Sequence, residues 1–187
     1  MASLKQIHSS LSFVATPSLV AGSVANGPVG CVGEGDALLT AEPGMTVSIR
    51  TADCFPILLA DPVHRAVAAV HAGWRGTAAE IVQETLGHMR REYGTLPTDV
   101  SAAIGPGIGV CCYQVGEEVA RRFGKDTGGN LDLADENLRQ LTRAGVPRGQ
   151  IDLTGACTFC DAERFYSFRR EGERAGRMIS FIGIRKH

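Results

Sequence analysis

The sequence predicts one mixed domain of the α/β (α+β) class. Two apolar runs with the length and composition of buried strands occupy residues 55–60 and 66–70. A third run, residues 45–50, alternates apolar and polar side chains as a half-buried strand does. Residues 81–93 instead repeat apolar side chains at helical spacing. A chain of 187 residues that combines these patterns fits a single domain in which strands and helices share a core.

The first part of the chain is expected to be strand and loop. The apolar pattern in residues 3–18 predicts a strand next to His8. Residues 22–35 are rich in Gly, Ala, Ser and Val, which predicts a loop with a short strand near residues 29–32. The turn residues Glu-Pro-Gly at 42–44 separate this region from the alternating strand that follows.

The helix after the second apolar run is expected to begin at Thr77. Residues 77–80, Thr-Ala-Ala-Glu, match a capping box, and apolar residues then recur at helical spacing as far as Tyr93. The other expected elements are strands at residues 100–104, 151–153 and 177–184 and helices at residues 116–123 and 135–144.

Composition excludes several classes of protein. The hydrophobic fraction of 44% and charged fraction of 21% are those of an ordinary globular domain. A net charge of −1 argues against a nucleic-acid partner, since duplex binders usually show a basic footprint. There is no secretory signal and no apolar run of about 20 residues that would span a membrane. We therefore expect a cytoplasmic protein whose six cysteines serve as thiols, metal ligands or reactive groups rather than as a disulfide framework.

Three potential metal ligands lie at the ends of predicted strands. They are His8, Cys54 and His71, and a Cys/His₂ set is a good Zn²⁺ site that leaves a fourth position for water. Their spacing is too long for a zinc finger. The pattern alone leaves open the alternative of a buried cysteine and two hydrogen-bonded histidines.

Arg75 is a candidate anion-binding residue. It lies between Gly73 and Gly76, just before the predicted helix, where backbone N–H groups and the helix dipole favour a phosphate or carboxylate. The alternative is a salt bridge to Glu80 or Glu84 on the helix.

The other cysteines are expected to be structural. Cys111 and Cys112 are adjacent in a glycine-rich segment, where they should point apart and pack, and this segment should form a tight turn under or beside the site. Cys157 and Cys160 form a single C-x-x-C, which is a weak signal. A zinc site made of all four is conceivable, but two structural thiols are favoured because adjacent ligands strain the geometry.

A basic cluster follows the C-x-x-C. It is interpreted either as a solvated face or as a surface that holds an anionic substrate. Its members are Arg164, Arg169, Arg170, Arg174 and Arg177.

Four segments resemble, in order, the signature segments of the YfiH-like laccase-domain family, whose members have been called multicopper polyphenol oxidases and later purine nucleoside phosphorylases. They are TADCFPILLADP, AVAAVHAGWRG, AAIGPGIGVCCYQVG and CTFCDAERFYSFRREG. The resemblance covers residues 1–187 as one laccase-like domain and implies a four-layer α/β/β/α sandwich, related in architecture to a bacterial deamidase toxin. Family members usually carry some tens of residues before the Gln-x-His segment, here Gln6-Ile7-His8, so an N-terminal extension is expected to be lacking.

The resemblance also implies the site. The family's metal ligands correspond to His8, Cys54 and His71, and its Asp and Arg are matched by Asp36 and Arg75. The implied activity is zinc-dependent phosphorolysis of adenosine, inosine, guanosine and methylthioadenosine, with deamination of adenosine.

Roles can be assigned to individual residues on this basis. Asp53, next to a ligand, is the candidate proton shuttle, and Arg75 is the candidate phosphate site. Cys54 and His71 belong to the catalytic set as ligands, and Asp36 and Arg169 are further candidates for substrate binding. The expected partners are a purine nucleoside and phosphate, bound by a monomer or homodimer.

Two other functions are weighed against this one. A copper-binding polyphenol oxidase needs roughly ten histidines for its full metal cluster, whereas the chain has five, although a single His₂Cys site for Cu²⁺ is allowed. An amide hydrolase could use Cys54 as nucleophile and His71 as base, or could use the metal instead. Because a zinc-bound thiolate is a poor nucleophile, the zinc and cysteine mechanisms compete.

Overall fold

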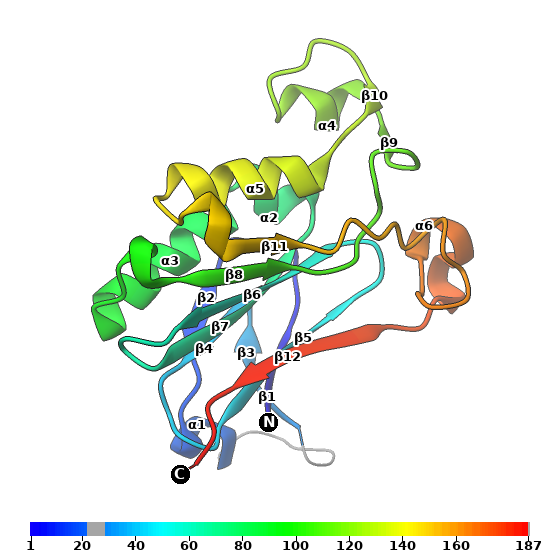
Figure 1. Cartoon of the computed structure of the whole chain (residues 1–187). Helices are drawn as coiled ribbons and strands as arrows, with labels where there is room; N and C mark the ends of the chain where they lie inside the picture. The colour runs from blue at the N-terminus through cyan, green and yellow to red at the C-terminus, as the bar shows by residue number, and fades with distance from the viewer. Residues whose placement is uncertain (22–28, 187) are drawn as a thin grey trace.

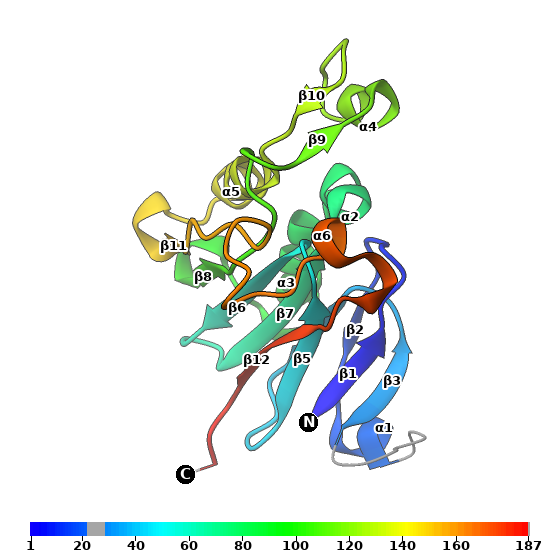
Figure 2. The same ribbon diagram turned by 90° about the vertical axis from the view of Figure 1, so that its right-hand side faces the viewer.

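The computed structural model describes residues 1–21 and 29–186 and has two sheets packed face to face, with helices on one side (Figures 1 and 2). The larger sheet has the strand order β11-β8-β6-β7-β4-β2 and the smaller one the order β12-β5-β1-β3. The strands of the larger sheet are β2 (Ser12–Val14), β4 (Ala37–Thr40), β6 (Phe55–Asp61), β7 (Ala66–Ala72), β8 (Ser101–Ile104) and β11 (Ile151–Leu153). Those of the smaller sheet are β1 (Ala2–Lys5), β3 (Gly30–Glu34), β5 (Thr46–Thr51) and β12 (Met178–Gly183).

Strand β7 lies at the centre of the molecule, and all seven of its residues are buried. It pairs antiparallel with both β6 and β4. One face of β7, including Ala68 and Val70, packs in a core with the helices, whereas Val67 and Ala69 pack against the smaller sheet. Burial on both faces explains why this strand is a continuous apolar run rather than an alternating one.

Helices α3 (Ile81–Tyr93) and α5 (Leu133–Arg143) cover the outer face of the larger sheet (Figure 1). The short α2 (Trp74–Ala78) follows β7 and contacts both of these helices. The two-stranded ribbon of β9 (Gln114–Val115) and β10 (Gly129–Asn130) projects above this layer with α4 (Glu117–Arg121). The remaining helices are α1 (Pro17–Ala21), which contacts β3, and α6 (Phe168–Glu171), which precedes β12.

The predicted class is confirmed, and the strands predicted at residues 45–50, 55–60, 66–70, 100–104 and 151–153 are present. In the part of the chain that the structure describes, no long helix covers the outer face of the smaller sheet. Ile179 and Phe181 of β12 are 56% and 62% exposed there. The helix layer and the two sheets of the expected sandwich are present. The five-residue α1 contacts β3, and its Val20 packs against the core between the two sheets.

Three predictions about elements need correction or a limit. The single strand expected in residues 3–18 is two strands, β1 and β2, which belong to different sheets and are joined by the segment that carries His8. The segment at residues 22–35 lies partly outside the described residues, and the short strand predicted near residues 29–32 is confirmed as β3. The helix expected at residues 116–123 is only the five-residue α4.

The predicted capping box is wrong. Thr77 lies inside α2, and its side chain exchanges hydrogen bonds with Asn137 of α5 instead of capping a helix. Glu80, at the start of α3, has a left-handed backbone with φ of 56° and makes no capping hydrogen bond. Contacts between helices therefore override the local capping pattern.

Among the described residues, no helix is long and apolar enough to cross a membrane.

Candidate metal centre and adjoining cavity

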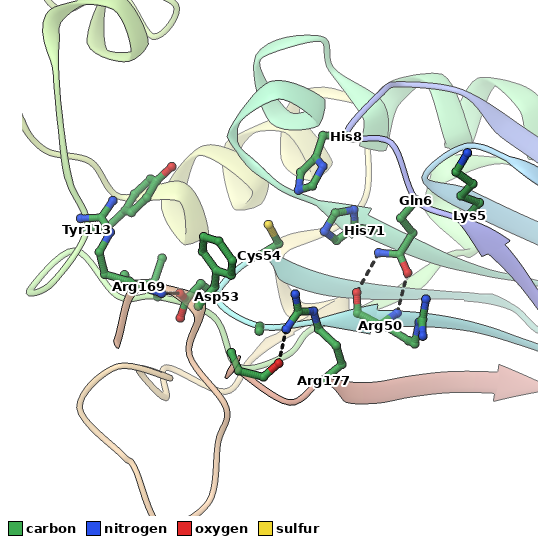
Figure 3. A pocket seen from close by; sticks show the side chains of 14 residues that line it. Lys5, Gln6, His8, Arg50, Asp53, Cys54, His71, Tyr113, Arg169 and Arg177 are labelled. Atoms are coloured by element: carbon green, nitrogen blue, oxygen red, sulfur yellow. Dashed lines mark hydrogen bonds between the residues drawn. The ribbon is translucent and has the colours of Figure 1, made fainter. Parts of the chain in front are cut away.

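The three predicted ligands come together at one end of the sheets, as Figure 3 shows. His8 follows β1, Cys54 lies in the short connection between β5 and β6, and His71 lies near the end of β7, opposite Pro56. One ligand atom from each residue lies within 4.8 Å of the other two. The rings of the two histidines are edge to face with centroids 4.9 Å apart.

Gln6 fixes the end of β1 and so helps to place His8. Its side chain donates to the backbone oxygen of Arg50 at 2.7 Å and accepts from the backbone nitrogen of Arg50 at 2.8 Å (Figure 3). These two bonds imitate backbone pairing where the regular pairing of β1 with β5 has ended. His8 then adopts a left-handed backbone with φ of 58°, which turns the chain away from the sheet.

Asp36 orients both histidines from behind. It is 0% exposed, and its carboxylate accepts from the Nδ1 of His71 at 2.7 Å and from the backbone nitrogen of His8 at 3.0 Å. It also accepts from the backbone nitrogens of Ile7 and Ser9 and from the Ser9 hydroxyl. The bond to Nδ1 leaves the Nε2 of His71 as the ring nitrogen for a metal, which is the usual carboxylate–histidine–metal arrangement.

Hydrogen bonds and charges within the metal-free site shift the pKa values of Asp36, His71 and Cys54. Burial raises the pKa of Asp36, but its bonds to His71 and Ser9 outweigh this and lower the pKa to about 2. Burial lowers the pKa of His71, but its bonds to Asp36 and Cys54 outweigh this and raise the pKa to about 9. For Cys54, burial is likewise outweighed by interactions with His71 and His8, which lower the pKa to about 7. The thiol is thus prepared to become a thiolate, the form that binds metal.

Gly73 allows the ligands to approach one another. A Cβ atom at this position would lie 2.9 Å from the Cys54 sulfur and 3.1 Å from the Cδ2 of His8. Any other residue would therefore push into the space between two ligands. This close approach, together with the thiol and two imidazoles and the buried carboxylate behind them, fits a metal ion held by three protein ligands.

A cavity of about 740 Å³ opens beside these ligands, a volume within the range of small-molecule sites. Asp53 supplies the carboxylate of its lining and is 9% exposed. Its oxygens accept from the Thr158 hydroxyl and from the backbone nitrogen of Arg169, each at 2.7 Å. Asp53 has a left-handed φ of 84°, so two distant segments hold it in a conformation that non-glycine residues rarely adopt.

The cavity is rich in cations. Arg50, Arg169 and Arg177 line it, and among the described residues none of the three has a carboxylate within ion-pair distance. Lys5 lines it too but is paired with Glu34 at 2.6 Å. Three guanidinium groups without a counter-ion around one carboxylate make the cavity suited to an anion.

Two aromatic side chains of the lining, Tyr113 and Phe168, were not predicted as site residues. Arg169 lies over the ring of Tyr113 at 5.4 Å, and Arg177 over that of Phe168 at 5.9 Å. Burial raises the pKa of Tyr113 to about 12, so its hydroxyl stays protonated as a donor. The position of Tyr113 at the end of the glycine-rich segment, expected to lie beside the site, was the available signal.

The structure places two predicted site residues outside the cavity lining. Arg75 is exposed and stacks on the neighbouring Trp74 at 4.3 Å, and in the described part of the chain it forms no salt bridge with Glu80 or Glu84. Asp36 lies behind His71 with its oxygens already occupied. Asp53, Cys54, His8, His71 and Arg169 all line the cavity.

The basic cluster near the C-terminal end is divided between two tasks. Arg164 pairs with Asp161, and Arg170 bonds Glu171 and the backbone oxygens of Thr158 and Phe159. These two arginines hold the loop together, whereas Arg169 and Arg177 of the same cluster face the cavity.

The expectation that Cys111 and Cys112 point apart is wrong. Both thiols lie near Cys160, at 3.7 and 3.3 Å, because the chain turns between Gly109 and Cys112. With Cys157 they form a second group of side chains that could hold a metal ion.

The chain is similar to known proteins along most of its length. Residues 1–185 match the model of the multi-copper polyphenol oxidoreductase laccase family. A protein of Bacteroides thetaiotaomicron named purine nucleoside phosphorylase is 45% identical over 165 residues, which cover 81% of this chain and 61% of that protein. A prokaryotic protein named adenosine deaminase RL5 is 37% identical, over 80% of this chain and 61% of its own length.

The crystal structure of YlmD from Geobacillus stearothermophilus has a TM-score of 0.91 and 33% identity, and the match covers 99% of this chain and 73% of that one. The chain thus spans about 61% of the length of the curated relatives just named.

Proposed function

Because the chain belongs to the multi-copper polyphenol oxidoreductase laccase family, and its relatives are named for nucleoside chemistry, we propose that it is a zinc-dependent purine nucleoside phosphorylase that also deaminates adenosine. The observation that carries the proposal is the convergence of His8, Cys54 and His71 at the edge of a cavity lined by three guanidinium groups.

One sulfur and two nitrogen donors suit zinc, and the proposed ligands are the Sγ of Cys54, the Nε2 of His71 and a ring nitrogen of His8. Bound there, zinc would supply a Lewis acid that lowers the pKa of water or polarises a substrate oxygen. Asp36 is assigned a positioning role, since it fixes the tautomer of His71 and the backbone of His8.

Phosphorolysis breaks the bond between the sugar and the purine and forms a bond between the sugar carbon and a phosphate oxygen. The phosphate is proposed to bind among Arg50, Arg169 and Arg177, none of which pairs with a carboxylate of the described residues. Arg75, at a helix start but outside the cavity lining, remains a further candidate for phosphate contact. The purine is proposed to lie against Tyr113 or Phe168, whose rings offer stacking surfaces.

Both reactions need a proton carrier. The departing purine must gain a proton in phosphorolysis, and in deamination the attacking water loses a proton while ammonia gains one. Asp53 is the proposed carrier, because it lines the cavity directly beside Cys54. The bonds from Thr158 and Arg169 fix the carboxylate and still leave each oxygen a lone pair for the proton.

The test is a panel of adenosine, inosine, guanosine and methylthioadenosine, each incubated with and without phosphate and followed by chromatography for free base. The proposal predicts base release that requires phosphate, together with conversion of adenosine to inosine in its absence. His71→Ala should abolish both reactions and lower the metal content, whereas His64→Gln, on a turn outside the cavity, should not. Phosphorolysis that survives in His71→Ala would refute the site assignment.

The two other histidines that the structure describes lie away from the candidate metal site, which argues against copper chemistry. His64 bonds Asp61 and His88 bonds Ser12, each at a place away from the cavity lining. A cluster of several copper ions would need more imidazoles at one place. Metal analysis after expression without added copper distinguishes the two readings, since the proposal predicts zinc and no blue absorption.

A cysteine hydrolase is the second candidate, because one observation favours it. In the metal-free site the lowered pKa of Cys54 and the raised pKa of His71 are those of a thiolate and imidazolium pair. Amide hydrolysis that survives removal of the metal and stops on alkylation of the thiol would establish this function instead.

A further inference from the structure

A second group of potential metal ligands, made up of four cysteine side chains, lies outside the candidate active site. Ligand atoms of the four residues all lie within 4.8 Å of one another, and all four cysteines are free. They come from two loops separated by more than 40 residues of sequence. The four are Cys111, Cys112, Cys157 and Cys160.

The separations suit tetrahedral coordination. Zinc–sulfur bonds of about 2.3 Å place neighbouring sulfurs about 3.8 Å apart in a tetrahedron. The Cys160 sulfur lies 3.7 Å from that of Cys111 and 3.3 Å from that of Cys112. A disulfide between Cys112 and Cys160 would involve only two of the four sulfurs and would not account for the proximity of the other two.

The backbone around the cluster is built for a thiolate. The N–H of Gly109 donates to the Cys157 sulfur at 3.2 Å, a contact that stabilises negative charge on sulfur and orients the ligand. A Cβ atom at Gly109 would lie 3.1 Å from the Cβ of Cys157 and 3.3 Å from the Cys111 sulfur. A side chain at this position would therefore make the facing atoms of Cys157 and Cys111 move by a few tenths of an ångström.

The cluster joins the loop that forms one wall of the cavity to the loop whose Thr158 bonds Asp53. Gly107 bridges to Cys157, and the backbone nitrogen of Thr158 donates to the Gly107 oxygen at 2.9 Å. One loop carries Ile108 and Tyr113 of the lining, and the other carries Thr158, which bonds Asp53. None of the four cysteines lines the cavity itself.

We propose that Cys111, Cys112, Cys157 and Cys160 bind one zinc ion in a structural site that is separate from His8, Cys54 and His71 and that fixes this wall of the cavity. Four protein ligands leave no position for water, which is the mark of a structural rather than a catalytic zinc site. Tetrahedral coordination by four sulfurs is also the geometry that selects zinc or iron over harder metals.

The test counts metal and thiols in the full-length His71→Ala variant, so that it does not depend on activity. Wild-type protein purified under reducing conditions should hold about two zinc ions per chain and His71→Ala about one. In His71→Ala, a thiol reagent should find four more reactive cysteines after chelation than before it. Exposed Cys31 should react both before and after chelation, and it serves as the internal control.

Replacing Cys160 by Ser in the wild-type background should lower the zinc content by one ion, and Cys31→Ser should leave it unchanged. Cobalt substituted into His71→Ala should show the strong sulfur-to-metal absorption of four thiolates, which keeps the test valid if Cys160→Ser does not fold. Full reaction of the four thiols without chelation, a mass two hydrogens low that reports a disulfide, or iron in place of zinc would each overturn the proposal.

Discussion

Asp36→Asn tests how the fold holds the metal ligands. The substitution keeps the shape of a side chain that is 0% exposed and replaces one accepting oxygen by an NH₂ group. The groups that contact the Asp36 carboxylate all donate hydrogen bonds or can do so. They are three backbone nitrogens, the Ser9 hydroxyl and the Nδ1 of His71. In either orientation the new NH₂ group must therefore face a donor.

The cost follows from which donors are left without an acceptor. If the amide nitrogen faces Ile7 and Ser9, partly buried backbone N–H groups lose their acceptor, which costs about 1–3 kcal/mol. If the amide nitrogen faces His71, two donors oppose each other until the ring proton moves from Nδ1 to Nε2. The Nε2 is then lost as a metal ligand. We expect a loss of about 2 kcal/mol, equivalent to a Tm lower by about 4–8 °C, and zinc affinity lower by about 10- to 100-fold.

The assays are thermal unfolding of the metal-free protein and competitive titration of zinc with a chelator. Asp61→Asn is the matched control, because Asp61 is also buried and bonds a histidine ring and two backbone nitrogens, but at a turn outside the cavity. It should lower stability and leave zinc affinity unchanged. Equal zinc affinity in Asp36→Asn and wild type would refute the positioning role of Asp36.

Further predictions concern the cavity and stability. Gly73→Ala should weaken zinc binding at the His8, Cys54 and His71 site more than it lowers the Tm, because its Cβ would lie 2.9 Å from the Cys54 sulfur; unchanged affinity in a chelator titration would refute this crowding. Arg177→Met should raise the KM for phosphate about tenfold or more, because it removes a charge-assisted hydrogen bond to the anion. It should leave the rate of deamination nearly unchanged, and Arg139→Met, at an exposed position outside the cavity, is the control. Arg75→Ala should likewise reduce phosphorolysis more than deamination, and equal losses in the two reactions would remove its proposed role. Burial raises the pKa of Asp61, but the backbone N–H of His64 and the other bonds to this carboxylate outweigh it and lower the pKa. The stability that the ionised Asp61 contributes is therefore complete above its unfolded pKa of about 3.9 and is lost as the pH falls through its folded pKa. The difference in free energy of unfolding between wild type and Asp61→Asn should shrink below about pH 4, and a constant difference would contradict this.

The elements that sequence patterns predicted well are those whose burial is simple. Strands β6 and β7 are continuous apolar runs because both faces of the larger sheet are covered, and α3 has one apolar face against that sheet. The start of α3 was misplaced because Thr77 bonds Asn137 in another helix. No local pattern contains that contact, which depends on how the helices pack.

The same distinction applies to the site. His8, Cys54 and His71 could be singled out because they are metal-binding residue types at strand ends, and the structure brings them together. The position of Asp36 behind His71 and the place of Tyr113 in the cavity depend on long-range packing. The meeting of the four cysteines likewise depends on the pairing of Gly107 with Cys157, which joins loops far apart in the sequence.

The central claim is that the metal at His8, Cys54 and His71 is required for turnover of purine nucleosides. The most direct measurement is phosphate-dependent release of base from inosine by wild-type protein and by His71→Ala, each stripped of metal and then returned to zinc. Zinc should restore the wild-type reaction, whereas His71→Ala should regain only the zinc of the four-cysteine site and no activity. Base release by the metal-free protein, or equal activity of the two zinc-loaded proteins, would contradict it.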